Sequence, residues 1–223
     1  MIRLLEKKSL ATLLVVSLAA TACDGGKGSS SPTAPASPAA TPSPFTVLFR
    51  GDVTDPTGDT LTYVTPSFTV AVPPDLLFGS IEVRSDGMVH FSAQLASGTF
   101  TVDQTMVSFD LDVDENRLTG KAEDGLGMDY FVAAGSKSLG STARVSRWVG
   151  FNVPAETVGT VPATFSSHGF DVDIPLSMLR DDGRMSLRVY SAAYIGQTVN
   201  GMAAFTSALD SMPDQNKAAV LVR

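Results

Sequence analysis

One stretch decides the fold class of this chain: Ile81-Glu82-Val83-Arg84-Ser85-Asp86-Gly87-Met88-Val89-His90-Phe91-Ser92-Ala93-Gln94-Leu95. Apolar and polar residues alternate on both sides of the central Asp86-Gly87 pair, and this alternation is typical of half-buried strands. An Asp-Gly pair accepts the positive φ angles of a two-residue hairpin turn. The stretch therefore predicts an antiparallel β-hairpin with one face in a hydrophobic core.

Similar alternation recurs downstream of this hairpin, with turn-forming residues between the runs. The further runs lie at 105–113, 128–133, 143–149, 169–174, 186–194 and 219–222. Helical periodicity is limited to one expected turn at 176–179, after Pro175. Many short strands at such spacing are typical of a sandwich or a barrel, so residues 45–223 are predicted to form one all-β domain.

Residues 1–22 have the three-part layout of an export signal. Basic residues precede an apolar run at 10–20, which is too short to span a bilayer because a spanning helix needs roughly 20 apolar residues. The signal ends in Leu18-Ala19-Ala20-Thr21-Ala22-Cys23, which resembles the lipobox of bacterial lipoproteins. The resemblance implies that Cys23 is lipidated and becomes the new N-terminus. The alternative is an ordinary secretory signal with a cysteine nearby by chance.

Cys23 is the only cysteine of the chain, and a lone exported thiol without a partner is otherwise hard to explain. We therefore predict a lipoprotein of the cell envelope that acyl chains hold to a membrane, outside the cytoplasm. Asp24 resembles an inner-membrane retention signal whose meaning differs between lineages, so the inner and the outer membrane both stay open. Residues 23–44 are rich in Ser, Pro, Ala, Thr and Gly, and we expect a disordered tether there.

The chain has 23 acidic and 16 basic residues and a formal net charge of -7 at pH 7. Removal of the signal makes the chain more acidic, because the signal contains more basic than acidic residues. A surface of this charge repels nucleic acid and anionic lipid, and it attracts cations. We therefore expect no nucleic-acid partner.

The segment 107–130 contains the candidate metal ligands. Oxygen-bearing side chains stand at alternate positions and are followed by a glycine. A hard cation such as calcium requires this pattern, because the chain must turn sharply for several oxygen ligands to converge on one point. The preferred side-chain ligands are Asp112, Asp114, Asn116 and Asp129, with Asp110 as the next candidate on the face of Asp112. The alternative is a solvated acidic turn, because Asp, Asn and Gly are good turn formers.

The spacing counted from Asp112 also resembles an EF-hand loop. The sixth position is Arg117, however, where that loop needs glycine, and the flanking residues alternate like strands rather than helices. We therefore expect a calcium loop between two strands.

The stretches 112–120 and 127–130 together resemble the loop of bacterial β-sandwiches related to family 9 carbohydrate-binding modules and to DOMON domains. Further matches are Asp55-Pro56-Thr57-Gly58-Asp59, the stretch 170–179, and Asp210-Ser211-Met212-Pro213-Asp214. The matches follow in order along residues 45–223. The resemblance implies a two-sheet antiparallel β-sandwich, jelly-roll-like, with a calcium site and a ligand surface that varies between members.

Sugar-binding members of that group grip glycans between aromatic side chains. Trp148 is the only tryptophan here, so a paired indole clamp cannot be built, and we expect Trp148 to pack in the core or on a sheet face. The tyrosines that remain as a stacking platform are Tyr63, Tyr130, Tyr190 and Tyr194. Haem-binding relatives use methionine and histidine as axial ligands, and the only histidines here are His90 and His168.

The sequence contains no serine-nucleophile elbow, zinc-protease motif, phosphate loop or dinucleotide fingerprint. Paired acids such as Asp171 and Asp173 are the only support for a glycan hydrolase. The sequence therefore predicts a non-catalytic, lipid-anchored binding module with calcium as its cofactor and a glycan or an envelope protein as its partner. The alternatives are a haem-binding electron-transfer domain, with haem as a less favoured cofactor, and a glycan hydrolase.

Overall fold

The computed structural model describes residues 44–223, apart from residues 63, 66–67, 71, 124, 137–138, 151–152, 180–182, 200–201, 207 and 215–216. The predicted signal at 1–22, Cys23 and all but the last residue of the predicted tether lie outside the described residues. Within the described part, no helix is long and apolar enough to cross a membrane.

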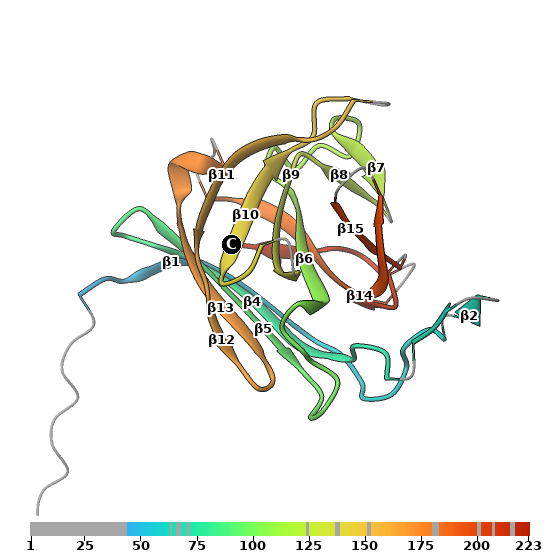
Figure 1. Ribbon diagram of the computed structural model, residues 1–223. Coiled ribbons are helices and arrows are strands. Elements are labelled where there is room, and N and C mark those ends of the chain that lie inside the picture. Colours follow the sequence, from blue (N-terminus) through green and yellow to red (C-terminus); the bar gives the residue numbers. More distant parts are fainter. Residues whose placement is uncertain are drawn as a thin grey trace, which may run out of the picture. The chain divides into compact units, whose positions relative to one another are not determined.

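The described chain is all-β and forms two large antiparallel sheets that face each other (Figure 1). The first sheet has the order β1-β4-β5-β13-β12. Its strands are β1 (Val47–Thr54), β4 (Leu76–Arg84), β5 (Met88–Leu95), β12 (Thr164–Ser166) and β13 (Gly169–Pro175). The predicted two-sheet antiparallel sandwich is therefore confirmed.

The second sheet has the order β11-β10-β9-β6-β14-β15, and β16 and β17 also pair with β14. Its strands are β6 (Gln104–Asp112), β9 (Tyr130–Ser136), β10 (Thr142–Arg147), β11 (Glu156–Pro162), β14 (Met185–Val199), β15 (Met202–Phe205), β16 (Asp210–Met212) and β17 (Val220–Val222). Two short hairpins complete the strands: β2 (Val64–Thr65) with β3 (Phe68–Thr69), and β7 (Lys121–Glu123) with β8 (Leu126–Met128).

The hairpin predicted from the opening stretch is formed by β4 and β5. Gly87 has a φ of 79°, and the Met88 N–H donates a hydrogen bond to Oδ1 of Asp86 at 3.1 Å. Ile81 of β4 and Phe91 of β5 are register partners, and both are fully buried. The alternation therefore places one face of the hairpin in the core, as predicted.

Aromatic rings from both sheets meet in the middle of the core. The rings of Phe91 and Phe109 pack edge to face with 5.3 Å between their centroids, and Phe170 packs against Phe109 at 6.2 Å. Because Phe109 touches rings of the opposite sheet, its truncation to alanine would leave a cavity that costs about 3–5 kcal/mol. Edge-to-face pairs add about 1 kcal/mol to the free energy of burial.

The other predicted elements are found, with shifted ends. The strand predicted at 128–133 is split, because β8 ends at Met128 and β9 begins at Tyr130, which leaves Asp129 between them. The predicted turn at 176–179 is the 3-10 helix η1 (Leu176–Met178). The sequence did not predict β1, β11 or β12, whose residues are mostly exposed and so lack a strong apolar alternation.

Candidate metal-binding site

The end of β6 and the junction of β8 with β9 bring three carboxylates together. Asp112 is the last residue of β6, Asp114 follows in the next loop, and Asp129 lies between β8 and β9. One carboxylate oxygen of each residue lies within 4.8 Å of the others, and we call these three residues the loop cluster. Two oxygens that bind one calcium ion at about 2.4 Å can be at most about 4.8 Å apart. The loop cluster therefore has the dimensions of a shared cation site.

Backbone hydrogen bonds hold the loop in a closed curl around these carboxylates. The Asn116 N–H donates to Oδ1 of Asp112 at 3.0 Å and to Oδ1 of Asp114 at 2.9 Å. The Gly127 N–H donates to Oδ2 of Asp112 at 3.2 Å. These donors orient the carboxylates, but they carry no formal charge and so leave the negative charge unneutralised.

The curl depends on a glycine at position 127. A Cβ atom there would lie 2.5 Å from the carbonyl oxygen of Asn116 and 2.6 Å from that of Thr119. Real Cβ atoms do not approach oxygen so closely, so any other residue would push the loop away from β8. Gly127 therefore allows the loop after β6 to lie against the strand that leads to Asp129.

Burial makes the charged form of the loop cluster unfavourable. Asp112 is only 1% exposed, Asp129 is half-buried and Asp114 is exposed to solvent. Burial, followed by the charge of Asp114, raises the pKa of Asp129 to about 6. Burial likewise raises the pKa of Asp112. A bound cation would offset this cost, and the exposed Asp114 leaves a path for it from solvent.

The two other predicted ligands have different surroundings. The side-chain oxygen of Asn116 accepts a hydrogen bond from the Leu118 N–H at 3.2 Å, so this residue reaches the cluster through its backbone N–H. Asp110 lies outside the loop cluster, and its Oδ1 accepts a hydrogen bond from the Ser108 hydroxyl at 2.5 Å. Residues two apart on a strand are about 6.6 Å apart, which separates Asp110 from Asp112.

Trp148 lies next to the loop cluster. It is half-buried, and it lines a hollow of about 250 Å³ together with Asp114 and Asp129. The backbone N–H of Trp148 donates a hydrogen bond to the carbonyl oxygen of Asp129 at 2.7 Å. The single indole of the chain is therefore a neighbour of the candidate cation site.

A second hollow, of about 340 Å³, lies on the outer face of the second sheet, over β6, β9, β10 and β14. Phe131 and Met128 contribute apolar surface to it, and Asp110, Arg144 and Tyr190 contribute polar groups. A concave, largely apolar surface with a few convergent polar groups is the usual form of a ligand site. This hollow, which we call the outer groove, is the candidate ligand surface.

The predicted stacking tyrosines are mostly placed elsewhere. Tyr130 is 4% exposed and belongs to the core, and Tyr194 packs against Phe205 with 5.8 Å between ring centroids. Tyr63 lies outside the described residues. Of the described tyrosines, Tyr190 lines the outer groove, so a sugar there would meet one tyrosine and Phe131.

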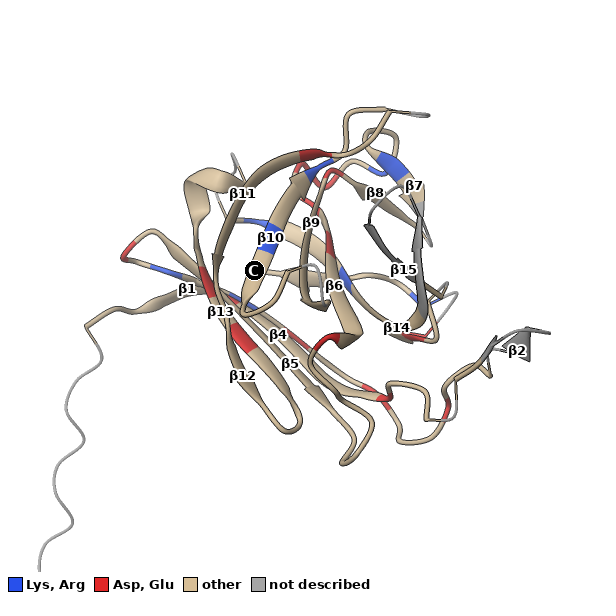
Figure 2. Cartoon of the chain, viewed as in Figure 1, with Lys and Arg blue, Asp and Glu red and all other residues tan. Residues whose placement is uncertain are grey.

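The outer face of the first sheet carries a ladder of ion pairs. Nη1 of Arg84 lies 2.9 Å from Oδ1 of Asp173, and Nδ1 of His90 lies 3.0 Å from the same oxygen. Asp171 and Asp173 share this face of β13, whose acidic positions appear in Figure 2, and both side chains are 51% exposed. Exposed acids beside basic side chains form a solvated surface. His168 is exposed in the turn between β12 and β13, with its Nδ1 2.8 Å from the Ser167 hydroxyl.

A further acidic group was not identified as a site from the sequence. It contains Asp55, Asp59, Asp75, Asp210 and Asp214, and we call these residues the five-aspartate cluster. The segments 55–59 and 210–214 each have an aspartate at both ends, which is the only sequence signal, and they stand far apart along the chain. Only the fold brings them together.

Comparison of the chain with family models, with curated proteins and with solved structures finds no match. The resemblance to family 9 carbohydrate-binding modules and DOMON domains therefore stays a prediction from the sequence.

Proposed function

We propose that this chain is a non-catalytic binding module of the cell envelope, anchored by lipid at Cys23, in which calcium stabilises a β-sandwich. The proposal joins the lipobox-like sequence to the sandwich and to the loop cluster. The observation that carries it is the convergence of Asp112, Asp114 and Asp129 within 4.8 Å at one end of β6.

Calcium at the loop cluster would have a structural role. The ion would join the end of β6 to the start of β9 and fix the intervening residues 113–128. Carboxylates supply part of the coordination shell of calcium, and backbone carbonyls and water usually supply the rest. Without the ion, the buried Asp112 would keep its charge against two neighbouring carboxylates, and the loop would open more easily.

The outer groove is the surface that we propose for the partner, which is either a glycan or an envelope protein. Phe131 and Tyr190 would supply aromatic surface, while Asp110 and Arg144 would supply an acceptor and donors for hydroxyl groups. Two residues of the groove lie close in sequence to the loop cluster. Asp110 is two residues before Asp112, and Met128 immediately precedes Asp129. Calcium binding would therefore stabilise one wall of the groove.

The calcium part is tested by thermal melts of the chain from residue 23 onward, with Cys23→Ser to prevent lipidation, in EDTA and in millimolar calcium. We expect calcium to raise the Tm. Asp114→Asn should remove most of the part of this rise that comes from the loop cluster. The matched control is Asp171→Asn, which removes an exposed aspartate of the other sheet and should leave the response to calcium unchanged. Equal responses in wild type and Asp114→Asn would contradict the proposal.

The ligand part is tested on a glycan panel and by affinity capture from envelope extracts, with Phe131→Ala and Arg144→Ala beside the wild type. Binding that both substitutions weaken at least tenfold would support the outer groove as the partner surface. Arg84→Ala, on the outer face of the first sheet, is the control. Binding that survives both groove substitutions but not the control would place the partner on the first sheet instead.

The anchor is tested by expressing the full chain and measuring the mass of the mature protein. A diacylglyceryl modification on Cys23, absent in Cys23→Ala, would support the lipoprotein assignment. Exported protein that has lost its signal peptide and still carries an unmodified thiol at Cys23 would contradict it.

A further inference from the structure

We propose that the five-aspartate cluster is a second divalent-cation site, which takes calcium and clamps the first strands of the domain to its C-terminal strands. Its ligands would be Asp55, Asp59, Asp75, Asp210 and Asp214. The site shares no residue with the loop cluster.

The ligands come from three separate segments. Asp55 and Asp59 follow β1, Asp75 immediately precedes β4, and Asp210 and Asp214 belong to β16 and the residues after it. They form two groups, one of Asp55, Asp59 and Asp214 and one of Asp59, Asp75 and Asp210, with ligand oxygens within 4.8 Å in each group. Asp59 belongs to both groups, so the five carboxylates are contiguous.

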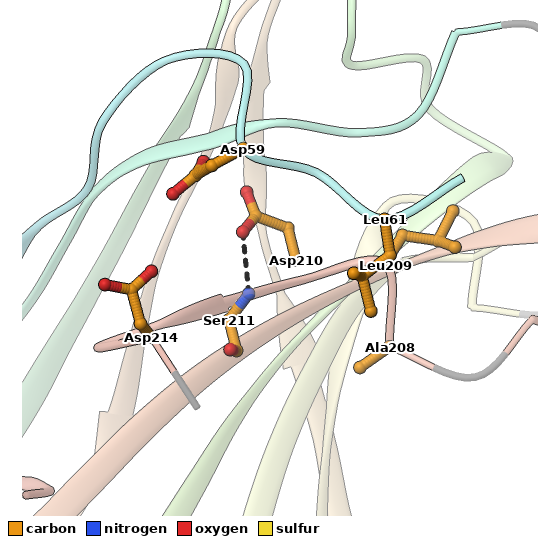
Figure 3. Close-up of a pocket in the computed structure, with 7 residues that line it drawn as sticks. All are labelled: Asp59, Leu61, Ala208, Leu209, Asp210, Ser211 and Asp214. Atoms are coloured by element: carbon orange, nitrogen blue, oxygen red, sulfur yellow. Dashed lines mark hydrogen bonds between the residues drawn. The ribbon is translucent and has the colours of Figure 1, made fainter. Parts of the chain in front are cut away.

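Hydrogen bonds to the backbone hold the buried ligands in place. Oδ2 of Asp210 accepts a hydrogen bond from the Leu76 N–H at 2.6 Å, across 134 residues of sequence. Oδ1 of Asp210 accepts one from the Ser211 N–H at 2.8 Å, which Figure 3 marks. Oδ2 of Asp75 accepts one from the Gly58 N–H at 2.9 Å. Each of these bonds joins or fixes a segment that contributes carboxylates to the cluster.

Arg188 holds the backbone of the segment after β16, which contains Asp214. Its side chain is fully buried, and Nη1 donates to the carbonyl oxygens of Pro213 at 2.7 Å and Asp214 at 3.4 Å. Nη2 donates to the carbonyl oxygen of Lys217. These contacts are to the backbone, and they leave the side chain of Asp214 directed toward the cluster.

Two oxygens of the cluster lack the partners that buried acids need. Asp75 is 5% exposed, yet its Oδ1 is buried without a hydrogen-bond partner, and so is Oδ2 of Asp55. A buried carboxylate oxygen without a donor is costly, so native proteins pair such atoms or bind a cation there. The unpartnered oxygen of Asp75 is the observation that separates this cluster from an ordinary acidic surface.

Three of the five aspartates line an accessible space. Asp59, Asp210 and Asp214 line a hollow of about 220 Å³. Figure 3 shows these residues on one side and Leu61, Ala208 and Leu209 on the other. Burial, followed by the charge of Asp210, raises the pKa of Asp55 to about 7, and burial raises that of Asp210 to about 6.

The donor set favours calcium over magnesium. Calcium takes six to eight oxygen ligands with flexible geometry, whereas magnesium needs near-ideal octahedral geometry and keeps several waters. Carboxylates from three segments, in two groups that share Asp59, suit the larger ion. A bound ion would close the loop between β1 and β16 and so oppose separation of the first and last strands of the domain.

The test is the calcium stoichiometry of the chain from residue 23 onward with Cys23→Ser, measured by native mass spectrometry and by calorimetric titration. We expect two bound calcium ions in the wild type. The double variant Asp59→Asn/Asp214→Asn, which changes two exposed residues without a hydrogen bond to a buried backbone group, should bind one ion and lose at least tenfold affinity at the other site. The separate variant Asp114→Asn should retain the five-aspartate site.

The outcomes separate the two sites. Two ions in both the wild type and Asp59→Asn/Asp214→Asn would overturn this inference, as would one ion that only Asp114→Asn removes. One ion that only Asp59→Asn/Asp214→Asn removes would support it and instead contradict the calcium part of the proposed function. Melts in EDTA guard against misfolding, because loss of two repelling carboxylates should leave the Tm of the double variant equal to or above that of the wild type.

Discussion

The two acidic clusters of this domain are built in opposite ways. The loop cluster comes from one stretch of chain, Asp112 to Asp129, and its carboxylates accept hydrogen bonds from within that stretch. The five-aspartate cluster joins segments that are far apart in sequence, as the bond between Leu76 and Asp210 illustrates. The first is a loop that a cation could organise, and the second is a junction that the fold assembles.

The clusters are also separated along the same strand. Asp112 is the register partner of Ser186 in β14, and Asp210 is the partner of Ser191. Five residues of strand span about 17 Å. This distance exceeds the screening length of about 8 Å at physiological ionic strength, so we expect the two sites to act almost independently.

The largest expected effect is that of calcium removal from the wild type. A ligand at 100 times its Kd stabilises the folded state by about 2.7 kcal/mol per site, so two filled sites contribute about 5 kcal/mol. For a domain of this size, that corresponds to a fall in Tm of about 10–20 °C in EDTA. Differential scanning calorimetry in EDTA and in calcium measures it, and a shift of half this size or less would indicate that a single site is filled.

Next in size is the effect of Asp210→Ala on the free energy of unfolding. It tests whether the five-aspartate cluster, unlike the loop cluster, is part of the structure that holds the fold together. This change leaves the N–H groups of Leu76 and Ser211 without acceptors, and it should cost about 2–4 kcal/mol even in EDTA. Asp114→Asn keeps an oxygen acceptor in an exposed loop and should cost less than about 0.5 kcal/mol in EDTA. Urea unfolding of both variants measures the difference, and equal costs would contradict the contrast.

A smaller effect is the pH dependence of stability in EDTA. The pKa values of Asp55, at about 7, and of Asp129, at about 6, lie above the unfolded value of 3.8. Between the unfolded pKa and the folded pKa of each group, the folded state binds more protons than the unfolded state. The free energy of unfolding should therefore fall as the pH rises from about 4 to about 7. Saturating calcium should remove or reverse this trend, because protons compete with the ion. Melts across this range in both buffers provide the measurement.

The smallest expected effect is the coupling between the clusters. The loss of stability in Asp59→Asn/Asp214→Asn and the loss in Asp114→Asn, both in calcium, should add within about 0.5 kcal/mol in the triple variant. A double-mutant cycle on the free energy of unfolding tests this. A larger coupling energy would mean that β14 transmits strain between the sites.

The sequence predicted what depends on local pattern. The alternation around Asp86-Gly87 predicted β4 and β5 and their turn, and the spacing of Asp112 and Asp114 predicted residues that do converge with Asp129. Asp129 joins them in the structure because a short hairpin, β7 with β8, returns the chain to the end of β6.

The rest depends on long-range packing. Asp75 stands alone between a proline and a leucine, and nothing near it in sequence predicts that it meets Asp59 and Asp210. Asp110 was placed with Asp112 by the period of the strand, but side chains two residues apart on one strand are too distant to share a small ion without the curl that begins after β6. The outer groove likewise needs four strands in register before its lining residues meet.

The most direct test of the central claim, that the loop cluster binds calcium, uses terbium as a luminescent substitute for calcium. Trp148 is the only tryptophan and lines the same hollow as Asp114 and Asp129, so excitation of its indole should sensitise terbium bound there. We predict luminescence that calcium competes away, that Asp114→Asn abolishes, and that Asp59→Asn/Asp214→Asn leaves intact. Luminescence that persists in Asp114→Asn, or its absence from the wild type under saturating terbium, would contradict a cation site in this loop.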